Sequence, residues 1–142
     1  MKVTLAILSF FVLCACAQDG PNIKQIENMQ FFIDNKKNNE IIEIEPGLQY
    51  SVVEYGGQSG STPSLNDTIS AHFHGTLTNG EVFWSSLDSE PLQIELSKLI
   101  IGCQKTISLM KEGDKWTVYI DPTMAYGEEG RPEIPSNSIL IF

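Results

Sequence analysis

The sequence contains few of the residues on which most catalytic and metal-binding sites depend. Among its 142 residues there are only 2 histidines and 3 cysteines. His72 and His74 flank Phe73, so a strand would point both imidazoles to one face, but no further Cys or His cluster supplies a third metal ligand. There is no Gly-rich phosphate loop and no set of nucleophile, His and acid. Conventional acid–base, nucleophilic and metal-dependent catalysis are therefore not expected, and neither is a metal or cofactor.

Basic residues are scarce as well. The chain has 9 Lys and Arg against 18 Asp and Glu, and its only basic cluster is the short segment NKKNN at 35–39. Proteins that bind nucleic acid usually carry a basic face. Nucleic acid is therefore not an expected partner.

No apolar run reaches the 18 residues that a membrane span needs. The opening MKVTLAILSFFVLCACAQDG instead has the order of a secretory signal peptide: one Lys, an apolar run over 3–13, then small residues. Residues 1–17 are therefore predicted to be a signal peptide. We expect an exported protein, either periplasmic or attached to a membrane of a bacterium.

Two cleavage sites overlap at the end of this segment. Ala15-Cys16-Ala17 before Gln18 fits an ordinary A-x-A site, whereas the sequence LCAC ending at Cys16 fits a bacterial lipobox, in which Cys16 would carry lipid. We favour the lipobox. Either cleavage leaves Cys103 as the only unmodified thiol, so no internal disulfide is expected.

Hydrophobic periodicity divides the rest of the chain into a helical segment and a β-rich segment. Apolar residues at 23, 26, 29 and 33 have helical spacing, which predicts a short amphipathic helix, and NKKNN then ends the pattern. Residues 18–46 are predicted to form this helix and a linker. From Ile41 the period becomes two, with Pro46-Gly47 as a break.

Strand patterns then follow one another, with a turn at Asn79-Gly80. One segment differs: the stripe of Ile100, Cys103, Ile107 and Met110 predicts a helix, with Ser97 as its N-cap. The expected fold is an antiparallel sheet packed on a single helix. The predicted strands after the loop at 56–67 are TISAHFHGTL at 68–77, EVFWSS at 81–86, LQIEL at 92–96, DKWTVYI at 114–120 and SILIF at 138–142.

Four segments resemble one known family. They are FFIDNKKNN from Phe31, GLQYSVV from Gly47, ISAHFHGTLTNGEVFWSS from Ile69 and LIIGCQKTISLMKEGDKWTVYIDPTMAYGEEGRPEIPSNSILIF from Leu99, and AYGEEGRPEIPSNSILIF is the most specific part. Together they resemble the FKBP-type peptidyl-prolyl cis-trans isomerases, in particular the bacterial exported group similar to the macrophage-infectivity-potentiator proteins. The resemblance implies an α+β fold, with a twisted antiparallel half-barrel sheet wrapped around one short helix, over residues 47–142.

The resemblance also implies a site, an apolar pocket that holds a proline ring. Tyr126 has a hydroxyl to offer a substrate carbonyl. Ordinary core packing is the alternative reading of most of the other residues. The residues assigned to catalysis are Tyr126, Phe83, Ile100 and Phe142, and those assigned to substrate binding are Phe73, Trp84, Leu92, Leu99, Cys103 and Ile134.

Three of these positions depart from the family pattern. Phe73 stands where the family has Tyr, Trp84 where it has the Asp that bonds that Tyr, and Cys103 where it has a floor Trp. Two function classes follow: a working isomerase of reduced activity, which we favour, and a module that binds proline segments with little turnover. The implied partners are X-Pro segments of unfolded or exported proteins, macrolide immunosuppressants, and a membrane if Cys16 is lipidated.

Family members continue their last strand beyond the position of Phe142. The expectation is therefore either that the sequence is a fragment or that the last strand is short and leaves the neighbouring edge less protected.

Overall fold

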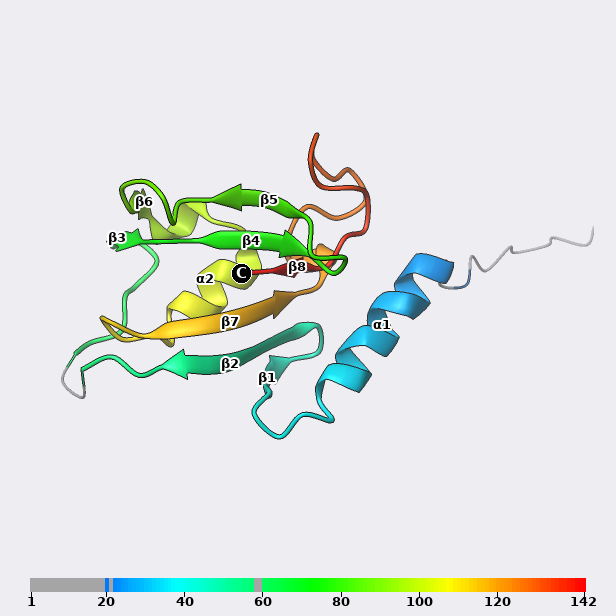
Figure 1. Ribbon diagram of the computed structural model, residues 1–142, viewed down its shortest axis with the longest axis horizontal. Coiled ribbons are helices and arrows are strands. Elements are labelled where there is room, and N and C mark those ends of the chain that lie inside the picture. The colour runs from blue at the N-terminus through cyan, green and yellow to red at the C-terminus, as the bar shows by residue number, and fades with distance from the viewer. Residues whose placement is uncertain (1–19, 21, 58–59) are drawn as a thin grey trace, which may run out of the picture.

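The computed structural model describes residues 20, 22–57 and 60–142, so the expected signal segment and Cys16 lie outside it. Its body is a twisted, open antiparallel sheet with strand order β1-β2-β7-β8-β4-β5, beside a separate two-stranded ribbon of β3 and β6 (Figure 1). The expected fold class is confirmed. The elements are α1 (Ile23–Asn35), β1 (Ile42–Glu45), β2 (Leu48–Glu54), β3 (Thr68–Ala71), β4 (His74–Leu77), β5 (Val82–Ser85), β6 (Leu92–Glu95), α2 (Ile101–Ile107), β7 (Lys115–Ile120) and β8 (Leu140–Ile141), with short 3-10 helices at Leu96–Lys98 and Pro122–Met124.

Helix α1 begins at a capping box and packs by polar as well as apolar side chains. The Asn22 side chain accepts from the Gln25 backbone N–H at 2.9 Å, and the Gln25 side chain accepts from the Asn22 N–H at 3.0 Å. The buried residues of the helix are Asn28 and Phe32. The apolar stripe at 23, 26, 29 and 33, which predicted the helix, is exposed to solvent instead.

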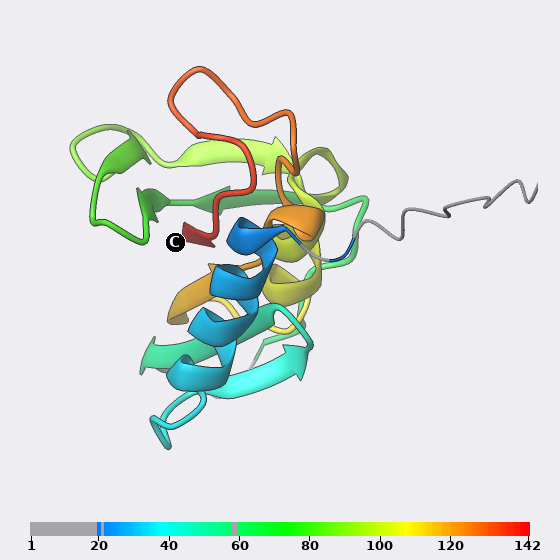
Figure 2. The same ribbon diagram turned by 90° about the vertical axis from the view of Figure 1, so that its right-hand side faces the viewer.

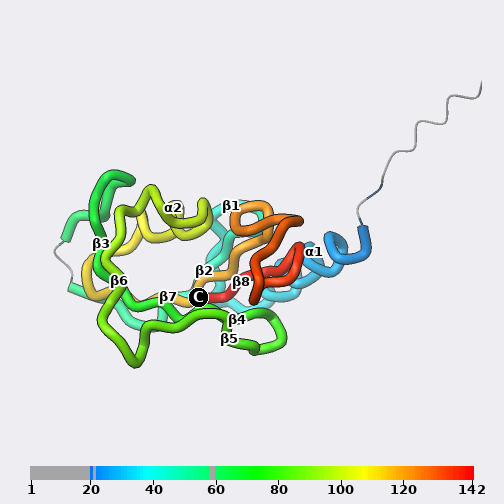
Figure 3. The backbone as a smooth tube through the Cα atoms, turned by 90° about the horizontal axis from the view of Figure 1, so that it is seen from above, coloured from blue at the N-terminus to red at the C-terminus, as the bar shows by residue number. Residues whose placement is uncertain are grey.

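Alternation along the strands separates the two faces of the sheet. Leu48, Val118 and Ile120 belong to the core cluster between the sheet and α2, whereas Gln49 and Tyr119, which pair with each other, point to the opposite face. Phe31 of α1 lies 6.1 Å from the Tyr119 ring. Helix α1 therefore covers the outer face, at the end of the molecule away from β3 and β6 (Figure 3).

Helix α2 packs closely on β7 because Gly102 has no side chain. A Cβ on Gly102 would lie 2.4 Å from Ile120 Cγ2. The prediction that Ser97 caps this helix is wrong: Ser97 lies in the preceding 3-10 helix, where its hydroxyl donates to Glu95, and the N-cap position is Ile100. The turn before α2 is held instead by Gln104 Nε2, which donates to the Leu99 carbonyl at 2.6 Å.

The prediction of one strand over residues 68–77 is also wrong, because the chain divides there between two sheets. β3 pairs with β6, and β4 pairs with β5 and β8. At the break, Ser86 bonds the backbone of Phe73 at both ends: its N–H donates to the Phe73 carbonyl at 2.9 Å, and its Oγ accepts from the Phe73 N–H at 3.0 Å. Phe73 is thereby fixed between the two strands.

The last strand lies in the middle of the sheet. β8 pairs with β4 on one side and with β7 on the other. Phe142 continues this pairing, since its N–H and C=O exchange hydrogen bonds of 3.0 and 2.8 Å with Val118. In the described part of the chain, no helix combines the length and the apolar character of a membrane span.

Candidate functional site

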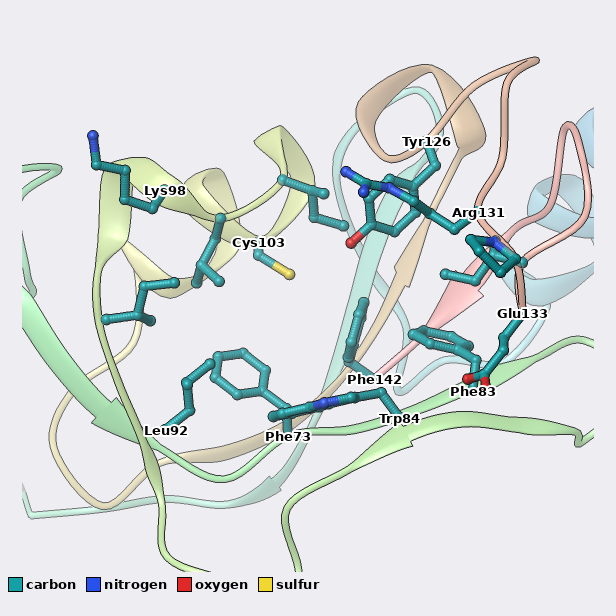
Figure 4. A pocket seen from close by; sticks show the side chains of 15 residues that line it. Phe73, Phe83, Trp84, Leu92, Lys98, Cys103, Tyr126, Arg131, Glu133 and Phe142 are labelled. Carbon is teal, nitrogen blue, oxygen red and sulfur yellow. The ribbon is translucent and has the colours of Figure 1, made fainter.

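A cavity of about 680 Å³ lies between α2 and the sheet. Its walls come from elements far apart in the sequence: Phe73 before β4, strand β5, strand β6, the start of α2, the loop after β7, and Phe142 directly after β8 (Figure 4). Its lining residues are Phe73, Phe83, Trp84, Leu92, Ile94, Lys98, Leu99, Ile100, Cys103, Tyr126, Arg131, Pro132, Glu133, Ile134 and Phe142.

Both members of the Phe83-Trp84 pair line this cavity, although neighbouring strand residues normally face opposite ways. The register explains the exception, because Gly75 pairs with Trp84 while the next residue, Thr76, pairs with Val82. Phe83 is the extra residue of a β-bulge, a distortion that re-aims side chains. Gly75 makes the arrangement possible, since a Cβ there would lie 2.4 Å from Phe83 Cζ.

Four aromatic rings form one continuous wall. The Phe142 ring stands edge-on to Phe83 at 5.5 Å and to Phe73 at 6.2 Å between centroids. Trp84 lies 6.1 Å from Phe73 and is 41% exposed, so it forms the rim of this wall. Edge-to-face contacts of this kind stabilise a fixed ring arrangement.

Cys103 of α2 points into the cavity from the helix side (Figure 4) and is only 5% exposed. Burial without a charged or hydrogen-bonding partner raises the pKa of its thiol to about 12. The thiol stays protonated at neutral pH. It therefore acts as a small apolar surface and is not a nucleophile.

The polar groups of the cavity come mainly from one loop. The Tyr126 hydroxyl points into the space (Figure 4), and the Arg131 guanidinium lies over the Tyr126 ring, 4.9 Å from its centroid. Such stacking restrains both side chains. At the tip of the loop, Arg131 and Ile134 exchange backbone hydrogen bonds of 2.8 and 2.9 Å. The site thus combines an apolar interior with a hydroxyl donor that points into it.

The two histidines lie outside this cavity. His72 Nδ1 is 2.9 Å from the Ser86 carbonyl, and His74 Nδ1 is 3.1 Å from Ser85 Oγ. Within residues 20, 22–57 and 60–142, no three side chains of His, Cys, Asp or Glu gather where they could hold a metal ion.

Comparison with known proteins identifies the family. The sequence model of the FKBP-type peptidyl-prolyl cis-trans isomerases matches residues 59–142, more than half of the chain. The chain belongs to this family.

Relatives of this FKBP-type chain include a protein of the group that the sequence led us to expect. The chain is 39% identical to "Peptidyl-prolyl cis-trans isomerase Mip" of Coxiella burnetii, over 79% of this chain and 49% of that protein. It is 35% identical to the isomerase FkpA of Aeromonas hydrophila, over 83% of this chain and 44% of the relative. The expected likeness to the macrophage-infectivity-potentiator group is confirmed. The chain spans about half the length of these curated relatives.

A solved structure supports the same assignment. The crystal structure of FkpA from Escherichia coli superposes with a TM-score of 0.76 at 33% identity, covering 83% of this chain and 55% of that one. The FKBP-type fold described above is therefore shared with a relative.

The structure brings all ten residues named from the sequence to this cavity. Their separate roles in binding and turnover remain predictions. Five further lining residues were missed: Ile94, Lys98, Arg131, Pro132 and Glu133. Each stands within three positions of a residue that was named, so nearness in the sequence was the only available signal. The contact of Arg131 with Tyr126 carried no signal in the sequence.

Proposed function

We propose that this chain is a peptidyl-prolyl cis-trans isomerase that assists the folding of exported proteins, and that the cavity is its active site. The observation that carries the proposal is an aromatic, largely apolar cavity with the Tyr126 hydroxyl aimed into it, in a chain whose relatives are named as isomerases. Tyr126, Phe83, Ile100 and Phe142 are assigned to catalysis. Phe73, Trp84, Leu92, Leu99, Cys103 and Ile134 are assigned to holding the proline segment.

The reaction makes and breaks no covalent bond. Rotation about an X-Pro bond is slow because twisting it disrupts amide resonance, across a barrier of about 18–20 kcal/mol. The planar amide carries more separated charge than the twisted amide, so water stabilises the planar form. An apolar cavity that fits the twisted amide lowers the barrier by removing that water. A thousandfold acceleration needs only about 4 kcal/mol.

The side chains divide this task between shape and hydrogen bonding. The edge-to-face rings of Phe83 and Phe142 give the proline ring a rigid wall, with Cys103 opposite. Tyr126 offers the one phenolic hydroxyl of the lining, which can donate to a substrate carbonyl as the amide twists. Arg131 over its ring keeps that hydroxyl oriented.

The second candidate, a binding module without turnover, has less support. It rests on the changes at Phe73, Trp84 and Cys103, yet Trp84 and Phe73 still supply wall area to the cavity. The isomerase assignment agrees both with these contacts and with the names of the relatives.

An X-Pro tetrapeptide assay tests the proposal. Tyr126→Phe should lower kcat/KM by about threefold to tenfold, since one hydrogen bond to the twisting amide is lost. Tyr55→Phe is the matched control, because Tyr55 is an exposed tyrosine that does not line the cavity. Ile100→Trp, which fills the cavity, should abolish turnover. Equal activity in Ile100→Trp and wild type would refute the assignment of the site.

Ligand competition gives an independent test of the same cavity. Macrolide immunosuppressants, implied as ligands by the family resemblance, should inhibit peptide turnover competitively. Phe142→Ala should weaken both ligand and peptide binding and lower stability by roughly 3 kcal/mol, because Phe73 and Phe83 lose their shared partner.

The division of the chain is part of the proposal. Residues 1–17 are assigned to a signal peptide, 18–46 to the helix and linker, and 47–142 to the isomerase domain. Strand β1 belongs to the 18–46 segment but pairs with β2 at the edge of the domain's sheet. We assign the mature protein to the periplasmic side of a bacterial membrane, attached through lipid on Cys16. Its clients there are X-Pro segments of unfolded exported proteins.

A further inference from the structure

Helix α1 makes a direct hydrogen bond to the loop that borders the cavity. The side-chain amide of Asn28 donates to the Asn137 carbonyl at 2.9 Å, across 109 positions of sequence. Asn28 is only 5% exposed. A buried amide of this kind is costly to leave without its partner, so the contact fixes the position of both groups.

Asn137 closes the base of that loop. It is the only non-glycine residue with a positive φ in the described chain, at 55°, and its N–H donates to the Gly127 carbonyl at 2.8 Å. Gly127 directly follows Tyr126, and Arg131, Glu133 and Ile134 lie between the two ends. Asn28 therefore bonds the backbone at the base of the 127–137 loop, and this loop carries one wall of the cavity.

The other half of α1 is anchored separately, on the sheet. Gln49 of β2 is fully buried, and its Nε2 donates to the Phe32 carbonyl at 3.0 Å. Its Oε1 accepts from the Asn35 amide at 3.0 Å. The C-terminal part of the helix is thus fixed to the outer face of the sheet while its N-terminal part reaches the loop, which lies directly above it in Figure 2.

We infer that Asn28 is a positioning residue for the isomerase site: α1 braces the 127–137 loop against the sheet and so sets where Ile134 and the Arg131–Tyr126 pair stand. This inference rests on the proposed function. Without the brace, the loop would spend less time in the conformation that closes the cavity, and the substrate would have to order it on binding.

The expected kinetic effect falls on binding. A loosened loop lowers the fraction of free protein in the binding-competent conformation, and bound substrate restores that conformation, so Asn28→Ala should raise KM by about threefold to tenfold and change kcat by less than about twofold. Asn28→Leu removes the donor while keeping the volume, which preserves the packing if the alanine variant folds poorly.

Asn35→Ala is the matched control. It removes another α1 amide and leaves buried Gln49 short of a partner, but it does not touch the loop. The measurements are KM and kcat on an X-Pro tetrapeptide, with melting temperature for each variant. A larger KM rise in Asn28→Ala and Asn28→Leu than in Asn35→Ala, at similar melting temperature, supports the brace. Equal KM effects in all three, or none, would overturn it.

Amide hydrogen exchange separates this inference from the proposed function. The N–H groups of Arg131 and Ile134 are bonded to each other's carbonyls, so loosening of the loop should speed their exchange in Asn28→Ala and not in Asn35→Ala. That readout needs no catalysis. A wild-type chain without turnover would refute the isomerase proposal, whereas unchanged exchange in Asn28→Ala would refute the brace.

Discussion

At the scale of single residues, the three departures from the family pattern lie in one compact region. Phe73 and Trp84 replace a Tyr and an Asp that would bond each other, and their rings lie 6.1 Å apart. Cys103 replaces a large indole in the lining of the same cavity. Both polar partners are gone together, so neither leaves an unpaired group. At these positions the cavity lining is less polar than the family pattern implies, and it offers fewer fixed dipoles.

We expect the three departures to slow turnover, and restoring them as a set should reverse this. Phe73→Tyr with Trp84→Asp and Cys103→Trp should raise kcat/KM on an X-Pro peptide about fivefold, which corresponds to about 1 kcal/mol of added transition-state stabilisation. Trp84→Asp alone should lower the melting temperature, because its carboxylate would border the rim beside Phe73 without a hydroxyl donor. A triple variant that folds and is no faster than wild type would show that Trp84 is a competent substitute.

Single residues also show where sequence reasoning reached its limit. Most apolar members of the cavity could be named, since their types and spacing match the family, although Ile94 and Pro132 were missed. The side to which Trp84 points could not be predicted. It depends on Phe83 being the unpaired residue of a bulge, and bulges arise from pairing between strands. Charged Lys98 reaches the site from the 3-10 helix before α2 and charged Glu133 from the loop after β7, and a residue type alone does not predict that.

At the scale of elements, the β4–β5 pair is built around the absence of a side chain at Gly75. Gly75→Ala should drive its Cβ to 2.4 Å from Phe83 and 3.0 Å from Phe142. Overpacking of this kind costs about 1–3 kcal/mol and would turn Phe83 away from the cavity. Melting temperature and peptide KM measure both effects. Gly60→Ala is the control, because a Cβ there meets nothing within 4 Å. Similar melting temperatures and KM values for Gly75→Ala and Gly60→Ala would contradict the claim that Phe83 needs a glycine at position 75.

The turn between α2 and β7 is joined to the β2–β3 loop by one carboxylate. Asp114 accepts from the Lys111 N–H at 2.9 Å and from the Gly56 N–H at 2.7 Å, and these bonds lower its pKa below the ordinary 3.8. A lowered folded-state pKa stabilises the protein above pH 3.8, and the contribution is lost as the pH falls through the lower value.

Asp114→Asn should therefore be less stable than wild type at pH 7, and the difference should shrink as the pH approaches 3. Thermal melts across that range measure it. Asp88→Asn, at an exposed loop position, provides the comparison. If the difference in melting temperature between Asp114→Asn and wild type stays constant with pH, the charge of the carboxylate does not contribute to stability.

Elements also divide cleanly into those that periodicity could predict and those it could not. The period-two runs correctly indicated β2, β5, β6, β7 and β8. The break between β3 and β4 was hidden, because Ser86 replaces the missing ladder bonds with its own backbone and hydroxyl. The face on which α1 packs was hidden too, since it uses the amides of Asn28 and Asn35 in addition to apolar side chains.

At the scale of the whole molecule, the sheet lies between α1 on its outer face and the cavity and α2 on its inner face. The polar brace from Asn28 and the anchor at Gln49 make the helix a support for the site on the outer face of the sheet. The surface of the molecule is acidic on balance, because the chain carries a formal net charge of −9. Anionic lipid headgroups repel such a charge, so electrostatic attraction does not hold the protein at a membrane.

We predict that any attachment of the mature protein to a membrane depends on lipid at Cys16. Each buried methylene contributes about 0.8 kcal/mol, and stable anchoring takes more than one acyl chain, so losing the acylated cysteine removes the dominant attractive term. Cys16→Ala, expressed in a bacterial host, should move the protein from the membrane fraction to the soluble fraction. Mass spectrometry of the wild-type N-terminus should find an acylated Cys16. A native protein that begins at Gln18, with a variant that partitions as wild type does, would assign the ordinary A-x-A cleavage instead.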